Sequence, residues 1–358
     1  MSEKTPAREM TFAEAIRDAT AVCLQRDPRT FVIGLGVPDP KGIFGTTAGL
    51  AAEFGAQRVL DAPLSENALT GLIIGAALSG MRPILTHQRI DFALLSFEQI
   101  VNQAAKWYYM FDGRGGTVPI VIRMIIGRGW GQGPQHAQSL SSWFAHIPGL
   151  KVVAPASPAD AKGMLIASVE DDNPVIYLEH RWLHNMRGPV PAGYHRTPLG
   201  KCLVARKGND VTVVASSHMV VEALRAADFA ASQAGVDMEV IDVRCLNPLD
   251  FETIRESVRK TRRLLVADDD APHCGFAAEI IARISESGLG LAAPPVRVTH
   301  PDCPSPSSAA LAAAFYPTDR DLFVAAARLA GRGADAVARY PERPCPADVP
   351  HLQFPGPF

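Results

Sequence analysis

The chain has 358 residues, which at roughly 150 residues per domain leaves room for about two domains. Apolar residues make up 47% of it and the formal net charge is −2, a balance typical of an ordinary α/β protein that lacks the basic surface needed to hold nucleic acid or an anionic membrane. The longest weakly polar stretch, residues 69–81, is shorter than the roughly 20 residues of a membrane helix, and the first residues lack the apolar core of a signal peptide.

The first 190 residues alternate short apolar runs with helical patterns, which predicts βαβ units and a mostly parallel sheet flanked by helices. Ser157 followed by Pro158 is typical of a helix N-cap and first helical residue. Small residues crowd the segment 69–78, so another backbone can approach that helix closely. We expect helices over 14–26, 69–78, 97–109 and 157–169, and strands over 31–35, 58–60, 119–126, 150–155 and 175–178.

Residues 186–206 carry Pro and Gly, break this rhythm and indicate a link between domains. A second αβ pattern follows, with strands expected over 210–215, 238–243 and 264–267 and helices over 219–234 and 277–285. The division we predict is an N-terminal extension over 1–10, a first domain over 11–190, a linker over 191–206, a second domain over 207–332 and a Pro-rich tail over 333–358 that packs on a surface or a partner.

Six cysteines are spread along the chain without any CxxC spacing. This pattern favours reduced thiols in a cytoplasmic protein over a disulfide framework or a zinc site.

The usual nucleotide, hydrolase and zincin motifs are absent from the chain. The segment 61–67 instead places a carboxylate, Glu66, at a Pro-marked turn between a strand-like run and the small-residue helix. Because Leu64 and Ala68 flank it, this carboxylate would be poorly solvated and suited to catalysis. The alternative is an ordinary helix-start carboxylate, favoured by the helix dipole and accompanied by Ser65 as the cap.

A second segment, residues 127–138, has alternating glycines directly after a predicted strand. Such a loop lets a ligand approach the backbone, and ligands bind outside the carboxyl ends of parallel strands. His136 stands near the end of the loop, which makes it a candidate catalytic residue, although a lone histidine is more often structural.

Long runs of the chain resemble the β subunit of 2-oxoacid dehydrogenase E1 components, a thiamine-diphosphate enzyme family. The runs are PLSENALTGLIIGAALSGMRPI (63–84), EQIVNQAAKWYYM (98–110), the segment 135–180 and several stretches between 211 and 308. The resemblance covers about residues 10–330 in order, with few gaps.

The resemblance implies a pyrimidine-binding α/β domain followed by a transketolase C-terminal α/β domain. It implies that Glu66 hydrogen-bonds N1′ of the aminopyrimidine of thiamine diphosphate, that Phe92 packs on that ring, and that Leu64 and Gln88 also contact the cofactor. The family's motif near the thiazolium falls on Gln135 and His136, so His136 is expected to transfer a proton and bind the oxo or carboxylate group of the substrate. Ala137 stands where the family has serine, so this position has no hydroxyl for any hydrogen bond that the family's serine makes.

The family's diphosphate anchor, a GDG followed by paired asparagines that hold Mg²⁺, is absent, and the nearest string is FDG at 111–113. In two-subunit members that motif belongs to the α chain. The resemblance therefore implies an α subunit that carries the Mg²⁺ site, an α₂β₂ heterotetramer and an active site shared between the chains.

Some family members hold a structural K⁺ through backbone oxygens at a helix end, and here the alternative is an ordinary solvated helix terminus. The matching positions are Ile120, Ser168, Val169, Asp171 and Asn173.

Polar residues stand at 86–91, where the family's dehydrogenases are mostly apolar, and His87 and Arg89 are among them. Together with Arg128, Trp130 and Gln135 they indicate a polar substrate or acceptor, or else contacts with the α subunit. The leading hypothesis is decarboxylation of a 2-oxoacid with transfer of the acyl group to lipoyl E2. The alternative is a two-component transketolase or acyloin-forming ligase that uses an aldehyde or a ketose substrate. A non-catalytic relative is a third class, which the presence of both Glu66 and His136 disfavours.

Overall fold

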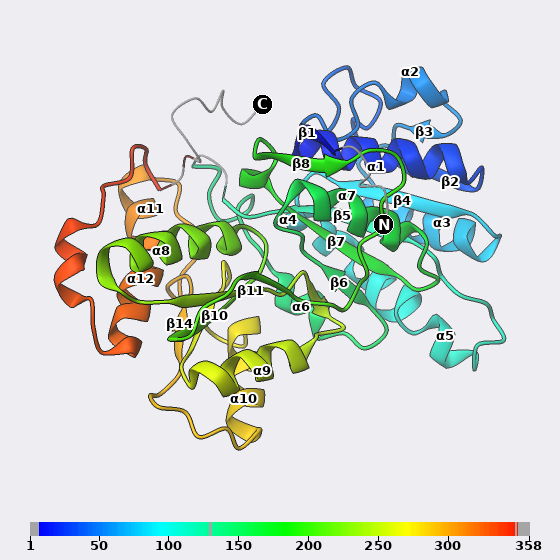
Figure 1. Cartoon of the computed structure of the whole chain (residues 1–358). Coiled ribbons are helices and arrows are strands. Elements are labelled where there is room, and N and C mark those ends of the chain that lie inside the picture. Colours follow the sequence, from blue (N-terminus) through cyan, green and yellow to red (C-terminus); the bar gives the residue numbers. More distant parts are fainter. Residues whose placement is uncertain (1–6, 129–130, 348, 350–358) are drawn as a thin grey trace, which may run out of the picture. The chain divides into compact units, whose positions relative to one another are not determined.

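The computed structural model of the chain describes residues 7–128, 131–347 and 349. The chain divides into two compact units, residues 1–126 with 143–199 and residues 127–142 with 200–358 (Figure 1). The glycine-rich segment 127–142 therefore groups with the second unit, whereas the sequence places it inside the first domain. The reason is tertiary: Arg128 bonds to backbone carbonyls of Pro317 and Ala347, far along the chain.

The first unit is built on a parallel sheet whose strands follow the order β6–β7–β5–β4–β2–β3. The central strands are buried on both faces, which is why the sequence shows them as continuous apolar runs. The strands are β2 (Thr30–Ile33), β3 (Val59–Leu60), β4 (Arg82–His87), β5 (Val121–Ile126), β6 (Lys151–Val153) and β7 (Val175–His180).

Helices begin and end at recognisable caps in this unit. In α1, Thr11 and Glu14 form a reciprocal capping box, so the helix starts two residues earlier than the spacing predicts. In α7, the Ser157 side chain accepts from the Asp160 N–H and Pro158 is the first helical residue. The α-helices are α1 (Phe12–Arg26), α2 (Leu50–Phe54), α3 (Glu66–Leu78), α4 (Ile90–Ala93), α5 (Trp107–Met110), α6 (Ser141–Ala145) and α7 (Pro158–Val169), with 3₁₀ turns over Leu94–Ser96 and Arg181–Leu183.

Two segments differ from their predictions. The expected helix over 97–109 is interrupted by a π-helical stretch, Gln99–Ala104, where the Ala105 N–H bonds to Ile100 five residues back. The segment 186–206 is not all linker, because β8 (Arg187–Pro191) pairs with β1 (Ala7–Thr11) and β9 (Leu203–Arg206) pairs with a strand of the second sheet. Backbone hydrogen bonds place β8 and β9 in sheets although their side chains do not alternate between apolar and polar as in a typical strand.

The second unit has a sheet in the order β14–β13–β10–β11–β9, parallel except for its edge strand β9. Gly235 adopts a left-handed conformation (φ 60°) and ends α8, as the sequence predicts. The strands are β10 (Val211–Ala215), β11 (Met238–Asp242), β12 (Cys245–Asn247), β13 (Leu264–Ala267) and β14 (Val296–Val298). The helices are α8 (His218–Ala234), α9 (Phe251–Thr261), α10 (Phe276–Glu286), α11 (Ala309–Phe315), α12 (Asp319–Ala330) and a 3₁₀ helix over Ala334–Arg339.

Two further features bear on the class of protein. All six cysteines carry free thiols. Within the part of the chain that the structure describes, every helix is too short or too polar to cross a membrane.

Candidate active site

A pocket of about 240 Å³ lies in the first unit, where β2 and β4 end and where α3 begins. This is the carboxyl edge of the parallel sheet, the edge at which α/β proteins bind ligands. Its wall is mostly apolar, with a few polar groups. The lining residues are Gly34, Leu35, Pro63, Leu64, Glu66, Leu69, Leu85, Thr86, His87, Gln88 and Phe92.

Glu66 is the first residue of α3 and lines this pocket half-buried. The Ser65 side chain does not cap the helix; its hydroxyl donates to the Leu64 carbonyl instead, so the ordinary capping interpretation of this turn fails for Ser65. Leu64 is 74% exposed, which means that this chain by itself does not shield the Glu66 carboxylate in the way that the sequence suggests.

Two buried polar atoms of the pocket residues are left without hydrogen bonds. His87 Nε2 and Thr86 Oγ1 are both inaccessible to solvent, and neither finds a partner among residues 7–128, 131–347 and 349. Burial lowers the pKa of His87 to about 4, so its imidazole is neutral at pH 7. Buried polar groups are normally satisfied, so this pair indicates that a polar ligand completes the pocket. Thr86 is not among the site residues predicted from the sequence. Its position next to the last residue of β4, at the carboxyl edge of the sheet, is the signal that points to it.

Gln88 and Asp61 hydrogen-bond to the backbone of Leu35, which lines the pocket, and of the adjacent Gly36. The Gln88 side-chain amide donates to the Leu35 carbonyl at 3.2 Å, and Asp61 Oδ1 accepts from the Gly36 N–H at 2.8 Å. Arg89 is buried where α4 begins and is not among the lining residues. Burial and the nearby Arg89 charge lower the pKa of Arg181 to about 10. Of the predicted site residues, Leu64, Glu66, His87, Gln88 and Phe92 thus come together in one pocket.

The glycine-rich loop belongs to the second unit and carries Gln135 and His136. Gln135 is exposed and His136 is half-buried, while Ala137 is buried. A Cβ at Gly131 or Gly133, both at positive φ, would lie 2.7 Å or 2.5 Å from Ser307 atoms, so only glycine allows this close packing. Trp130 lies outside the described residues.

Arg128, a candidate substrate or interface residue, is fully buried in the second unit. Its Nη1 donates to the Ala347 carbonyl at 2.9 Å and its Nη2 donates to the Pro317 carbonyl at 3.2 Å. These contacts favour a structural task for its charge.

The helix end predicted to hold K⁺ is the C-terminus of α7. The carbonyl oxygens of Val169 and Asp171 accept from Arg82 Nη1, at 2.9 Å and 3.0 Å, and the Asp171 carboxylate accepts from Lys151 Nζ at 2.5 Å. The hydrogen bonds from Lys151 and Asn173 lower the pKa of Asp171 against the effect of its burial. The side chains of Arg82 and Lys151 thus already bind oxygen atoms of Val169 and Asp171, two of the residues predicted to hold K⁺. Over the described ranges, no group of three or more His, Cys, Asp or Glu residues is placed to hold a metal ion.

Comparison with known proteins assigns the family. Residues 8–186 match the transketolase pyrimidine-binding domain and residues 200–322 match the transketolase C-terminal domain. The β subunit of acetoin:2,6-dichlorophenolindophenol oxidoreductase from Cupriavidus necator is 42% identical over 332 residues, which cover 90% of this chain and 95% of the relative. The pyruvate dehydrogenase E1 β subunit of Rickettsia conorii is 39% identical over 318 residues, with 88% and 97% covered.

The chain belongs to the β-subunit family of thiamine-diphosphate-dependent 2-oxoacid dehydrogenases. The mitochondrial pyruvate dehydrogenase E1 β subunit of Ascaris suum, 40% identical over 87% of this chain and 88% of its own, is a further member. A solved split-gene transketolase, described as an inactive β4 tetramer, superposes with a TM-score of 0.74 at 22% identity over 90% of this chain and 98% of that one. It shows the transketolase-like fold that the sequence predicts.

The pocket residues fit the aminopyrimidine of the family's cofactor. An aromatic ring, Phe92, and leucine side chains offer apolar contact, and the Glu66 carboxyl offers a hydrogen bond to a ring nitrogen. The unsatisfied Nε2 of His87 and Oγ1 of Thr86 offer further polar contacts.

Proposed function

We propose that this chain is the β subunit of a two-component thiamine-diphosphate enzyme that decarboxylates a 2-oxoacid and transfers the acyl group to lipoyl E2. The observation that carries the proposal is the pocket at the carboxyl edge of the first sheet, with Glu66 at the start of α3 and two unsatisfied buried polar atoms beside it. The free thiols accord with a reducing compartment such as the cytoplasm.

Each pocket residue has a task in this proposal. Glu66 shares a proton with N1′ of the aminopyrimidine, Phe92 and Leu64 pack on the ring, and Gln88 holds the wall through the Leu35 carbonyl. When bound, thiamine diphosphate would supply an acidic thiazolium carbon whose deprotonated form is a nucleophile for carbonyl groups. His87 is neutral, so it is able to hydrogen-bond the ligand through Nε2 without placing a positive charge beside Glu66.

His136 and Gln135, on the glycine-rich loop, are proposed to face the substrate. A half-buried imidazole is able both to move a proton and to hydrogen-bond an oxo or carboxylate oxygen. Arg89 and Trp130 remain candidates for contacts with a polar substrate or with the partner chain.

An α subunit completes the site in this proposal. Leu64 lines the pocket and is nevertheless 74% exposed, and Leu72 on α3 is 53% exposed. Large exposed apolar side chains beside an open pocket are typical of a protein interface. The partner is expected to supply the Mg²⁺ that holds the diphosphate, in an α₂β₂ heterotetramer. A structural K⁺ at the end of α7 stays a prediction beside Arg82 and Lys151.

Use of an acyloin in place of a 2-oxoacid is the second candidate function. It is favoured by the 42% identity to a subunit of an acetoin oxidoreductase and by the polar atoms of Thr86 and His87 in the pocket. Reduction of a lipoyl domain by the reconstituted αβ pair, with a panel of 2-oxoacids and with acetoin, distinguishes the two substrates. Carbon–carbon bond formation with an aldehyde and without lipoate would favour the transketolase or acyloin-ligase alternative.

The test of the proposed site is Glu66→Gln in the reconstituted αβ complex. We expect kcat to fall about 100-fold or more, because the variant cannot share a proton with the cofactor ring. Assembly measured by size-exclusion chromatography should be unchanged. Glu252→Gln, on the exposed surface of α9, is the matched control and should retain activity within about twofold. Activity near normal in Glu66→Gln would overturn the cofactor assignment.

A further inference from the structure

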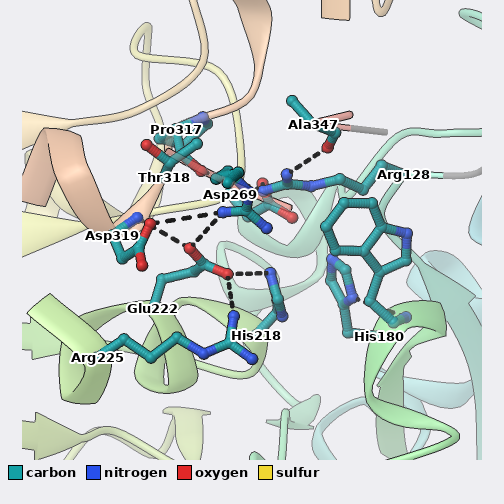
Figure 2. A network of polar contacts seen from close by, with 12 residues as sticks. Arg128, His180, His218, Glu222, Arg225, Asp269, Pro317, Thr318, Asp319 and Ala347 are labelled. Atoms are coloured by element: carbon teal, nitrogen blue, oxygen red, sulfur yellow. Dashed lines mark hydrogen bonds and ion pairs between the residues drawn. The ribbon is translucent and has the colours of Figure 1, made fainter. Parts of the chain in front are cut away.

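Arg128 at the base of the glycine-rich loop joins the loop to the second unit, alongside the close packing of Gly131 and Gly133 on Ser307. Arg128 lies beside Asp269 and Ala347 (Figure 2), and its guanidinium is 3.5 Å from Asp269 Oδ1. The guanidinium carbon is also 4.4 Å from the centre of the Tyr316 ring. The loop is closed at its base by the hydrogen bond from the Gly127 N–H to the Gln138 carbonyl at 3.2 Å. The base of the loop thus carries a fully buried charge with defined partners.

One of those partners, Ala347, lies near the end of the described chain. Residues 331–347, here called the C-terminal strap, run antiparallel to α8. Arg332 donates to the Gly235 carbonyl just beyond the end of α8, and Arg339 donates to the Gln233 carbonyl. The Tyr340 ring then packs 4.3 Å from that of Phe229, earlier in the helix.

The strap is next held at Glu222, in the first half of α8. Glu222 is fully buried and accepts from Arg343 Nη1 at 2.9 Å and from the Asp319 N–H at 2.8 Å. Figure 2 shows the same carboxylate joined to His218 and Arg225. The hydrogen bond with His218, together with the charges of Arg343 and Arg128, holds the pKa of Glu222 well below the usual range in spite of its burial. Four residues after Arg343 the strap reaches Ala347, buried, whose carbonyl receives Arg128.

We propose that the C-terminal strap positions the glycine-rich loop, with Arg128 as the positioning residue that connects them. Loss of the Ala347 carbonyl removes the acceptor of Arg128 Nη1 and leaves a buried N–H unpaired, which favours movement of the side chain or entry of water. Either change shifts the base of the loop that carries Gln135 and His136. The consequence for turnover rests on the proposed function of His136, whereas the consequence for the loop backbone does not.

Hydrogen exchange measured by mass spectrometry on the reconstituted αβ complex tests this proposal without turnover. A chain that ends at Tyr340 loses Arg343 and Ala347 but keeps the contacts of Arg332, Arg339 and Tyr340. We expect amides in residues 127–138 to exchange at least about 10-fold faster in it, while the exchange rates of amides in the second sheet change less than twofold. The first half of α8 is left out of this comparison, because Glu222 there loses its contact with Arg343. A chain that ends at Val349 keeps every described contact and is the matched control. Unchanged exchange in the loop of the shorter chain would overturn the proposal.

A double-mutant comparison separates positioning from general stability. Arg128→Met should loosen the loop by itself, and truncation after Tyr340 should then add less than twofold to loop exchange, because the connection is already broken. Arg343→Met, which leaves the chain at full length, should loosen the loop less than truncation does. In turnover, the truncated complex should lose kcat while the KM for the cofactor changes less than twofold. Additive effects of Arg128→Met and truncation on loop exchange would contradict the role of Arg128.

Discussion

At the scale of single residues, the first unit combines a carboxylate and a neutral imidazole in one pocket. Glu66 is half-buried, and His87 is 5% exposed with an Nε2 that finds no acceptor or donor in the described chain. A neutral His87 places no positive charge on that side of the pocket. The same burial has a thermodynamic consequence that can be measured on the chain alone.

His87 should make stability depend on pH. Its pKa is about 4 in the folded chain and near 6.5 when unfolded, so between these values the unfolded chain binds more protons. The contribution of neutral His87 to the free energy of unfolding is fully present above pH 6.5 and is lost as the pH falls toward 4. When the pH is lowered from 7.5 to 5, the free energy of unfolding of the wild-type chain should fall by about 2 kcal/mol more than that of His87→Gln. Urea unfolding at the two pH values measures this difference.

The control for this measurement is His146→Gln, a substitution of an exposed histidine. It should follow the wild-type pH dependence. Parallel stability curves for the wild type and His87→Gln would show that His87 titrates normally in the folded chain.

At the scale of elements, two helices of the first unit use glycine for opposite reasons. In α7, a Cβ at Gly163 would lie 2.2 Å from Thr197 Oγ1, so the helix packs directly on the segment that follows β8. In α3, a Cβ at Gly75 would meet nothing within 4 Å. Gly75 is exposed on the same helix as Leu72, so this face of α3 is open for a second protein.

Alanine substitutions at these two glycines should therefore have opposite effects. Gly163→Ala should destabilise the chain by about 1–3 kcal/mol, because Thr197 must move although alanine favours the helix. Gly75→Ala should stabilise it by about 0.5–1 kcal/mol through helix propensity alone. Urea unfolding of the isolated chain measures both, and a gain in stability for Gly163→Ala would show that α7 does not need the close approach.

At the scale of the whole molecule, the chain supplies two α/β units and, in the first of them, the open pocket proposed to hold the cofactor. The pocket is lined by apolar side chains and the Glu66 carboxyl group, and Leu64, which also lines it, is 74% exposed. Large exposed apolar residues also occur near α5, where Tyr109 is 87% exposed. These surfaces are expected to be buried when the α subunit binds.

The isolated chain should therefore bind thiamine diphosphate weakly or not at all. Titration calorimetry with Mg²⁺, performed with and without the α subunit, should give a Kd at least 10-fold lower for the complex, because the partner closes the pocket and anchors the diphosphate. Equal affinity in the two titrations would mean that this chain holds the whole cofactor site.

The sequence by itself determined the alternation of strands and helices, the family and the place of Glu66, because these depend on local periodicity, caps and long runs of matching residues. Ser157 with Pro158 starts α7 and Gly235 ends α8 as local chemistry requires. Only the tertiary structure decided the environment of the charges. Arg123 on β5 and Glu179 on β7 form a fully buried ion pair, and Arg128 bonds to Ala347 across 219 residues of chain. Such contacts join residues that no periodicity relates, since they exist only once distant segments have packed together.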